Sequence, residues 1–189
     1  MIKILLATLL FTATFASLAN SSSFHFSQMS YNKVEFDDVD KDLNGFDFKM
    51  NYEINDSFYL NWENIESNNS DVDFNMRNIG FGFHSSISKG IEGYTQLDWT
   101  RLKTSNANLN QGSNEDGYRF SLGIRRQRYE NVDIRVAFEY TDINNDTINI
   151  FVFEAAYRFT DRLSIYAIHK KQTNSDFSQY GIGLRYDIK

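Results

Sequence analysis

Apolar and polar residues alternate along most of this sequence, and the alternation returns about ten times. It is clearest in the segment FDFKMNYEI, which begins at Phe46, and in the closing segment YGIGLRYDI, which begins at Tyr180. Successive side chains of a β-strand point to opposite faces, so each segment has one apolar face and one polar or charged face. The pattern therefore predicts an all-β fold.

The first nineteen residues have the pattern of an export signal. Lys3 supplies the positive start, residues 4–15 form an apolar run, and Ser17-Leu18-Ala19 is a small-x-small cleavage site. The run is shorter than the roughly 20 apolar residues that a transmembrane helix needs. We therefore expect a cleaved signal peptide over residues 1–19 and one exported domain over residues 20–189.

Three features of the composition limit the class of protein. The net charge of −6 argues against binding to nucleic acid, which requires a basic surface. The chain has no cysteine, so it has neither a disulfide framework nor a thiolate metal site. It also has no proline, which cannot donate a hydrogen bond within a sheet, and this absence fits a closed sheet without edges.

The alternation divides the exported domain into ten expected strands. We place them at residues 23–36, 45–54, 57–65, 74–87, 93–102, 117–128, 133–140, 148–159, 163–171 and 178–188. The apolar phase changes between Phe26 and Met29 and again between Met76 and Ile79, which predicts a bulge or slip in each strand. The neighbours Ile165 and Tyr166 leave the facing of the ninth strand open, and an eight-stranded barrel is the alternative if the first segment is a tail.

The expected connections alternate between short and long. Short ones fall at residues 55–56, 88–90, 130–132 and 160–162, and long polar ones at 37–44, 66–73, 103–116, 141–147 and 172–176. Short turns at one rim and longer loops at the other are typical of outer-membrane barrels. The chain therefore predicts a closed antiparallel up-and-down transmembrane β-barrel, with both termini at the short-turn, periplasmic rim.

The two faces of the expected strands differ in a way that favours lipid outside. One face carries most of the large apolar rings, and aromatic residues such as Trp62 and Trp99 gather at strand ends, as they do where a membrane meets water. The other face carries small residues and nearly balanced charges, which suit a narrow lumen. The expected lumen charge network is Asp47, Lys49, Glu53, Glu63, Asp98, Arg119, Arg125, Arg135, Glu139, Glu154, Arg158, Arg185 and Asp187. A soluble barrel of the lipocalin type is the alternative, but so many inward rings would overfill it.

The first long connection holds a weak metal-binding candidate. Asp38, Asp40, Asp42 and Asn44 precede Gly45 in a pattern that resembles the start of a calcium loop. Counted from Asp40, the twelfth position of such a loop is Asn51 instead of a bidentate glutamate, and a strand follows instead of a helix. An acidic surface turn is the simpler interpretation, so no metal and no cofactor are expected.

No catalytic constellation is evident. His25, His84 and His169 are far apart in the pattern, and none lies beside a nucleophile at the long-loop rim, where barrel enzymes place their catalytic groups. Lys170-Lys171 is expected at a loop edge, in contact with water or lipid phosphates. We therefore expect a protein that is not an enzyme.

The chain resembles the diffusible-signal-factor-regulated family of small outer-membrane proteins of gamma-proteobacteria. The resemblance rests on the leader, the acidic D-x-D-x-N-G loop that runs into Gly45-Phe46, the segment from Tyr157 to Tyr166, and the closing Gly181 to Tyr186. More broadly, it is similar to barrels of the outer-membrane protein A and X type. The resemblance implies an outer-membrane barrel and brings no catalytic residues. Such barrels usually end on an aromatic residue, whereas Lys189 ends this chain.

These observations predict a structural or surface-interaction protein in the outer membrane of a Gram-negative cell envelope. A porin-like narrow channel for small solutes or ions is the first alternative, and a secreted soluble factor is the second. Expected partners are outer-membrane lipid and lipopolysaccharide, the barrel-insertion machinery and periplasmic chaperones. No nucleic acid is expected, and the sequence identifies no surface ligand.

Overall fold

The computed structural model describes residues 24–35, 42–106, 111–127, 131–144, 146–173 and 177–188. Within these ranges no helix is long and apolar enough to cross a membrane. The described residues form ten antiparallel strands: β1 (Phe26–Glu35), β2 (Leu43–Glu53), β3 (Phe58–Asn68), β4 (Val72–Ser88), β5 (Ile91–Asn106), β6 (Gln111–Gln127), β7 (Val132–Ile143), β8 (Asp146–Arg158), β9 (Leu163–Gln172) and β10 (Ser178–Asp187). The expected signal peptide lies outside the described residues.

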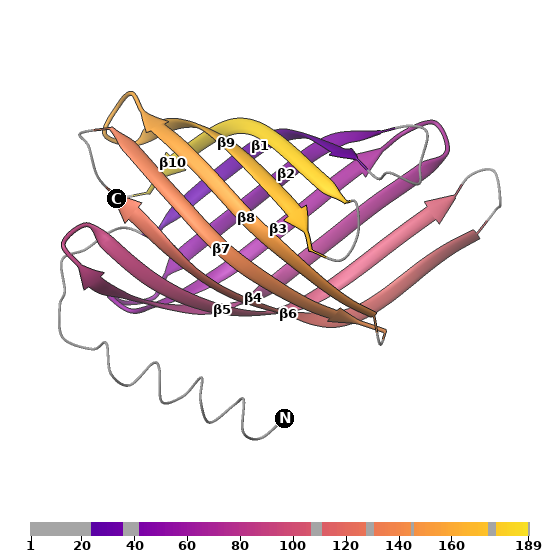
Figure 1. Cartoon of the computed structure of the whole chain (residues 1–189), viewed down its shortest axis with the longest axis horizontal. Coiled ribbons are helices and arrows are strands. Elements are labelled where there is room, and N and C mark those ends of the chain that lie inside the picture. The colour runs from indigo at the N-terminus through magenta and orange to yellow at the C-terminus, as the bar shows by residue number, and fades with distance from the viewer. Residues whose placement is uncertain are drawn as a thin grey trace, which may run out of the picture.

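The ten strands close into a barrel in which each strand pairs with its neighbours in the sequence (Figure 1). The first strand closes the ring by pairing with the last, from Phe26 opposite Asp187 to Glu35 opposite Ser178. On its other side β1 pairs with β2 from Phe26 to Val34. The first segment is therefore a full strand of a ten-stranded barrel, and the eight-stranded alternative is wrong.

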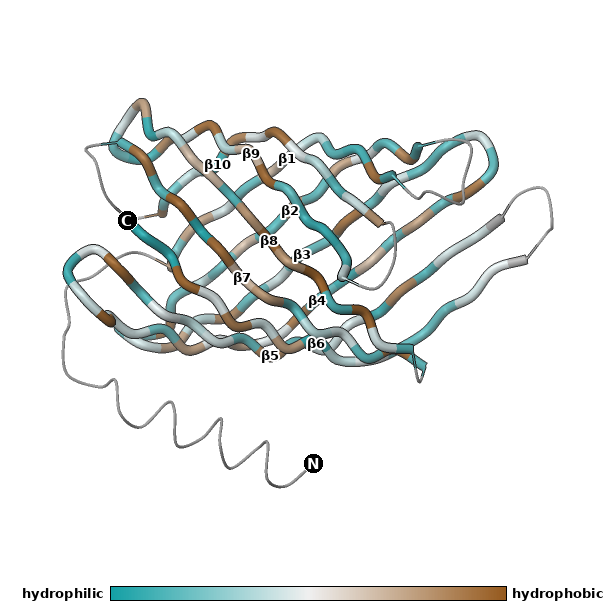
Figure 2. The backbone as a smooth tube through the Cα atoms, in the orientation of Figure 1, coloured by the Kyte–Doolittle hydropathy of each residue, from teal (hydrophilic) through white to brown (hydrophobic). Residues whose placement is uncertain are grey.

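The outer wall of the barrel is apolar. Large side chains stand exposed along its strands, among them Phe81 at 57%, Leu184 at 53% and Trp99 at 44% exposure, while the residues between them are buried in the interior. Apolar and polar residues follow one another along each strand in Figure 2. An apolar exterior and a polar interior are the inverse of a soluble barrel and are typical of a transmembrane one.

The short connections lie at the rim that also holds the described ends of the chain (Figure 1). The Lys89-Gly90 turn joins β4 to β5, with Gly90 at a φ of 74° that glycine adopts without strain. In the β2–β3 turn, the side-chain oxygen of Asn55 accepts hydrogen bonds from the backbone N–H groups of Ser57 and Phe58, both at 3.0 Å. The N–H of Ile188 donates to the carbonyl of His25 at 2.8 Å, so this rim also joins the two ends of the chain.

At the other rim, three expected long loops are largely strand. Pairing between β4 and β5 continues to Val72 opposite Asn106, and pairing between β5 and β6 continues to Asn106 opposite Gln111. Strands β7 and β8 likewise pair as far as Ile143 opposite Asp146. The sequence pattern missed these extensions because a strand that leaves the membrane is polar on both faces. At the right of Figure 1 the β3–β4 and β5–β6 hairpins extend past the other strands.

The two expected bulges are absent from the described strands. Strand β1 pairs without interruption, and Phe24 and Phe26 point into the lumen, where they are 3% and 6% exposed. The register of β4 is also continuous from Met76 to Ile79, and its irregularity lies between Ser86 and Ser88. The apolar phase changes in β1 because Phe24 and Phe26 face the lumen, and in β4 because Met76 shares the inward phase of Asn78.

Two glycines on the inner face make room for tyrosine rings on the neighbouring strand. Tyr59 lies opposite Gly82, and Tyr94 lies opposite Gly123. A Cβ at Gly82 would stand 2.1 Å from the Tyr59 ring, and one at Gly123 would stand 2.6 Å from the Tyr94 ring. These glycines therefore let the two rings lie flat against the wall and fill the interior. In β9, Tyr166 also faces inward and Ile165 faces outward, which answers the question that the sequence left open for this strand.

We expect Gly82→Ala to lower the free energy of unfolding by about 1–3 kcal/mol, because the added methyl overpacks the Tyr59 ring. The control is Gly112→Ala in the β5–β6 hairpin, where the nearest atom to the new Cβ is 3.2 Å away. Denaturant unfolding of each variant in lipid vesicles, followed on gels that separate folded from unfolded barrel, measures the difference. Equal stability of the two variants would contradict the proposed fit between ring and glycine.

Candidate functional site: the charged lumen

The thirteen charged side chains expected in the lumen all lie on the inner face of the barrel, and most are almost fully buried. They come from seven strands, because period-two alternation carries every second residue of each strand inward. Glu53, Arg135 and Arg158 are the more exposed members. The structure adds four side chains that can carry charge to this face: His84, Glu92, Asp133 and Lys170.

Arg119 is the centre of the network and is only 1% exposed. Its Nη1 lies 2.5 Å from Glu63 and 3.6 Å from Glu139, and its Nη2 lies 2.8 Å from Asp98. The Asp98 carboxylate also accepts a hydrogen bond from Arg119 Nε at 2.9 Å. Strands β3, β5 and β7 thus each contribute one carboxylate to a single guanidinium, whose fork of donors suits several acceptors.

Neutral side chains add hydrogen bonds to two of these carboxylates, Asp98 and Glu63. Asn61 donates to Asp98 at 3.0 Å, and Gln96 donates to the other oxygen of Asp98 at 2.7 Å. Asn78 donates to Glu63 at 3.0 Å and in turn accepts from Thr100 at 2.8 Å. A buried charge is tolerated when it is both paired and hydrogen-bonded, and Asp98 and Glu63 meet both conditions.

Lys170 of β9 reaches the network from the far side of the barrel. Its Nζ lies 3.3 Å from Glu63 and 3.9 Å from Asp47, and the residue is 3% exposed. The sequence pattern predicts Lys170 at a loop edge together with Lys171, and this prediction is wrong for Lys170. Its phase, shared with the inward Tyr166 and Ile168, is the signal that could have placed it inside.

A second cluster lies towards the short-turn rim. Asp133 accepts from Arg125 at 3.1 Å and from Arg158 at 3.2 Å, and Asp187 lies 3.0 Å from Arg185. The guanidinium carbon of Arg185 also stands 4.0 Å from the centre of the Phe26 ring, a cation–π distance. The inward phase of Phe26 therefore has a role, because its ring covers a buried cation.

The remaining predicted members differ in how they are paired. Arg135 lies opposite Glu154 in the β7–β8 ladder, at 2.8 Å, and also donates to the Tyr94 hydroxyl at 3.1 Å. Glu53 lies 3.4 Å from the Nε2 of His84. Lys49 is buried opposite Glu63 in the β2–β3 ladder but makes no ion pair with the described residues.

The three histidines are well separated and each contacts an aromatic ring. His84 is buried and stacks on Phe24 at 4.2 Å between ring centres. His25 meets Tyr52 edge to face at 4.8 Å, and His169 stacks on Tyr180 at 4.7 Å. Each histidine therefore packs against an aromatic ring, and the three do not come together in one site.

The candidate metal loop lies partly outside the described residues, since Asp38 and Asp40 fall there. Of its described members, Asp42 lies 2.7 Å from the Nζ of Lys33, and Asn44 is an exposed residue of β2. The hydrogen bond to Asp42, and to a smaller extent the one to Glu35, raises the pKa of the Lys33 ammonium. Over the described part of the chain, no three acidic, histidine or cysteine side chains gather as a metal site would require.

An exposed ion pair joins β5 and β6 on the outer surface, just beyond Trp99 towards the long-loop rim. Arg101 donates to both carboxylate oxygens of Asp116, at 2.8 and 3.1 Å, and its guanidinium lies 4.8 Å from the Trp99 ring centre. The hydrogen bonds from Arg101 hold the pKa of the Asp116 carboxyl below its usual value. This pair is the exposed counterpart of the buried Arg119 cluster.

The fold and the filled, charged interior define a closed transmembrane β-barrel of the outer-membrane type. Among solved structures, the barrel is similar to the NanC porin, with a TM-score of 0.57 at 8% identity over 86% of this chain and 100% of that one. The KdgM porin has a TM-score of 0.48 at 10% identity, over 86% and 99%. Ail, the attachment invasion locus protein of Yersinia pestis, has 0.44 at 17%, over 86% and 95%. The sequence matches no protein-family model and no curated protein. The NanC likeness shows the fold alone.

We expect Arg119→Met to destabilise the barrel by about 3–5 kcal/mol, because it leaves buried carboxylates without their shared cation. The matched control is Arg101→Met, which removes an exposed arginine from its pair and is expected to have little effect. Denaturant unfolding in vesicles compares the two variants. A loss from Arg101→Met as large as that from Arg119→Met would contradict the importance of burial.

Proposed function

We propose that the protein is a non-enzymatic barrel of the Gram-negative outer membrane, with a closed lumen, that serves as a structural and surface-interaction protein. The exposed apolar wall supports its place in a bilayer, with Trp62 and Trp99 on the outer surface. In this proposal the signal peptide is cleaved, and the short-turn rim faces the periplasm. The finer resemblance to the diffusible-signal-factor-regulated family belongs to the same proposal.

The closed lumen rests on a single observation above all, which is the burial of Arg119 among carboxylates from three strands. These side chains reach inward from β3, β5, β6 and β7, and Lys170 extends the network to β9. Tyr59 and Tyr166, at 0% and 2% exposure, fill more of the same interior. A small barrel whose interior is occupied by its own paired side chains is a rigid scaffold.

The surface that such a scaffold presents is the long-loop rim. At this rim, strands β4, β5 and β6 continue beyond Trp99 as a paired sheet of polar residues. Arg101 and Asp116 lie on the outer face of this sheet. We propose outer-leaflet lipopolysaccharide as a contact of this rim. Periplasmic chaperones and the barrel-insertion machinery are the proposed partners during assembly.

A narrow channel for small solutes or ions is the second candidate function. The charged interior favours it, because a polar lumen is also what a pore requires, and the similar protein NanC is named a porin. The two candidates differ in one respect only. In a channel the Arg119 network would leave room for a continuous path, whereas in a scaffold it would not.

Planar-bilayer recording separates the two. We expect no steady conductance steps from the purified wild-type barrel, because its lumen is occupied. The variant Glu63→Ala/Arg119→Ala removes both members of the central pair and is expected to conduct. The control Arg101→Ala/Asp116→Ala removes a pair outside the lumen and should remain silent. Steady steps from the wild type would contradict the closed scaffold and favour the channel.

A further inference from the structure

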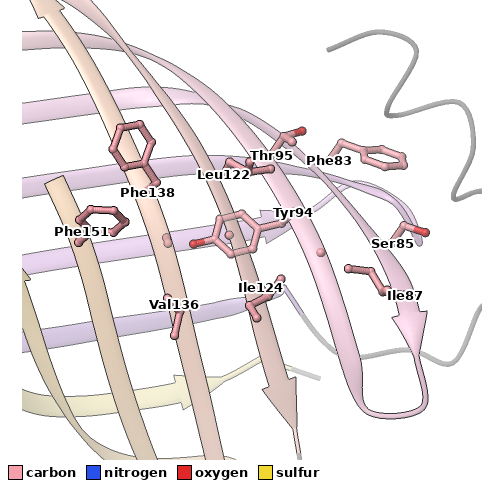
Figure 3. A pocket seen from close by; sticks show the side chains of 13 residues that line it. Phe83, Ser85, Ile87, Tyr94, Thr95, Leu122, Ile124, Val136, Phe138 and Phe151 are labelled. Carbon is pink, nitrogen blue, oxygen red and sulfur yellow. The ribbon is translucent and has the colours of Figure 1, made fainter. Parts of the chain in front are cut away.

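An apolar groove of about 350 Å³ lies in the outer wall of the barrel, where β4 to β8 approach the short-turn rim (Figure 3). Its lining side chains are mostly apolar, with Ser85 and Thr95 as polar members, and Tyr94 lies beneath it with its ring against Gly123 on the lumen side. The groove belongs to the surface that carries the exposed apolar side chains, so its occupant must be compatible with a hydrocarbon environment.

The groove exists because three outward positions carry small residues. Ser85, Gly93 and Thr95 follow the outward phase of β4 and β5, where the other strands place large side chains. Larger side chains rise on both sides: Phe83, Ile87, Leu122, Ile124, Val136 and Phe138. The result is a groove that follows β5 between these larger side chains.

Two cations stand at the short-turn end of this groove. Arg126 follows Ile124 by two residues on β6, so it lies about 7 Å beyond the groove along that strand. Lys89 lies in the turn that follows Ile87 and Ser88 at the end of β4. Both are exposed, and neither makes an ion pair with the residues that the structure describes. In a chain of net charge −6, this is a local excess of positive charge.

We infer that the groove is a binding site for one anionic glycerophospholipid. One acyl chain lies along Gly93 and Thr95, and the phosphate lies between Lys89 and Arg126. Charged headgroups and cationic side chains meet at this level of a membrane. A second copy of the barrel is disfavoured as the occupant, because packing the same faces together would bring the cations of both copies against one another. The inference rests on the proposed location in the outer membrane, and it adds the class of lipid that binds in the groove.

Native mass spectrometry of the purified full-length barrel in detergent tests the site. The probes are phosphatidylglycerol and phosphatidylcholine with identical acyl chains. We expect tighter retention of one phosphatidylglycerol molecule, and about fivefold weaker binding of it for each of Lys89→Gln and Arg126→Gln. Lys171→Gln, an exposed cation at the opposite rim, is the control and should change nothing. Thr95→Trp fills the groove from the lipid side and should weaken both lipids.

Several outcomes would overturn the inference. Equal retention of the two lipids by the wild type would remove the headgroup site, and unchanged binding by Thr95→Trp would remove the groove. A dimer that Thr95→Trp dissociates would assign the groove to a second copy. Heat-modifiable gel mobility verifies that each variant is folded, and Lys89→Gln and Arg126→Gln alter only exposed side chains. Membrane fractionation tests the proposed location separately: a barrel found in the outer membrane but without lipid preference would refute this inference alone.

Discussion

Every backbone N–H and C=O group of a lipid-facing strand must find its partner within the protein, because the hydrocarbon core of a bilayer supplies none. The pairing of β1 with β10, from Phe26 to Glu35, meets this constraint by joining the first strand to the last. Closure leaves no free edge along the membrane-facing part of the sheet. It also divides the side chains into an outer set that meets lipid and an inner set that must fill a narrow space, so the rest of the structure follows from it.

The inner set is filled by size matching and by charge compensation. Gly82 and Gly123 accept the rings of Tyr59 and Tyr94, and this fit packs the wall without displacing a strand. Charge is compensated by sharing, since Arg119 serves three carboxylates and Asp133 serves two arginines. Removing one member of such a set leaves the others buried without their partner.

Much of this architecture could be predicted from alternation alone, because one period serves both the strand and its two faces. Cross-strand pairs such as Asp98–Arg119 and Arg135–Glu154 follow once the register is known, but alternation does not supply the register. Two kinds of residue escaped prediction. Phe24 and Phe26 are apolar yet face inward, because they cover His84 and Arg185. Strand ends beyond the membrane, such as residues 103–105 of β5 and 113–116 of β6, lack the alternation because they carry polar residues on both faces of the sheet.

The central claim is that the large rings face lipid while the charged side chains face one another. The chain's two tryptophans, Trp62 and Trp99, both stand on the outer wall, at 37% and 44% exposure, and report on this directly. Reconstitution into vesicles of brominated phospholipid, followed by tryptophan fluorescence, is the most direct measurement. The account predicts strong quenching by bromine in the acyl chains and weak quenching by aqueous iodide. Strong iodide quenching with no effect of the brominated lipid would contradict it.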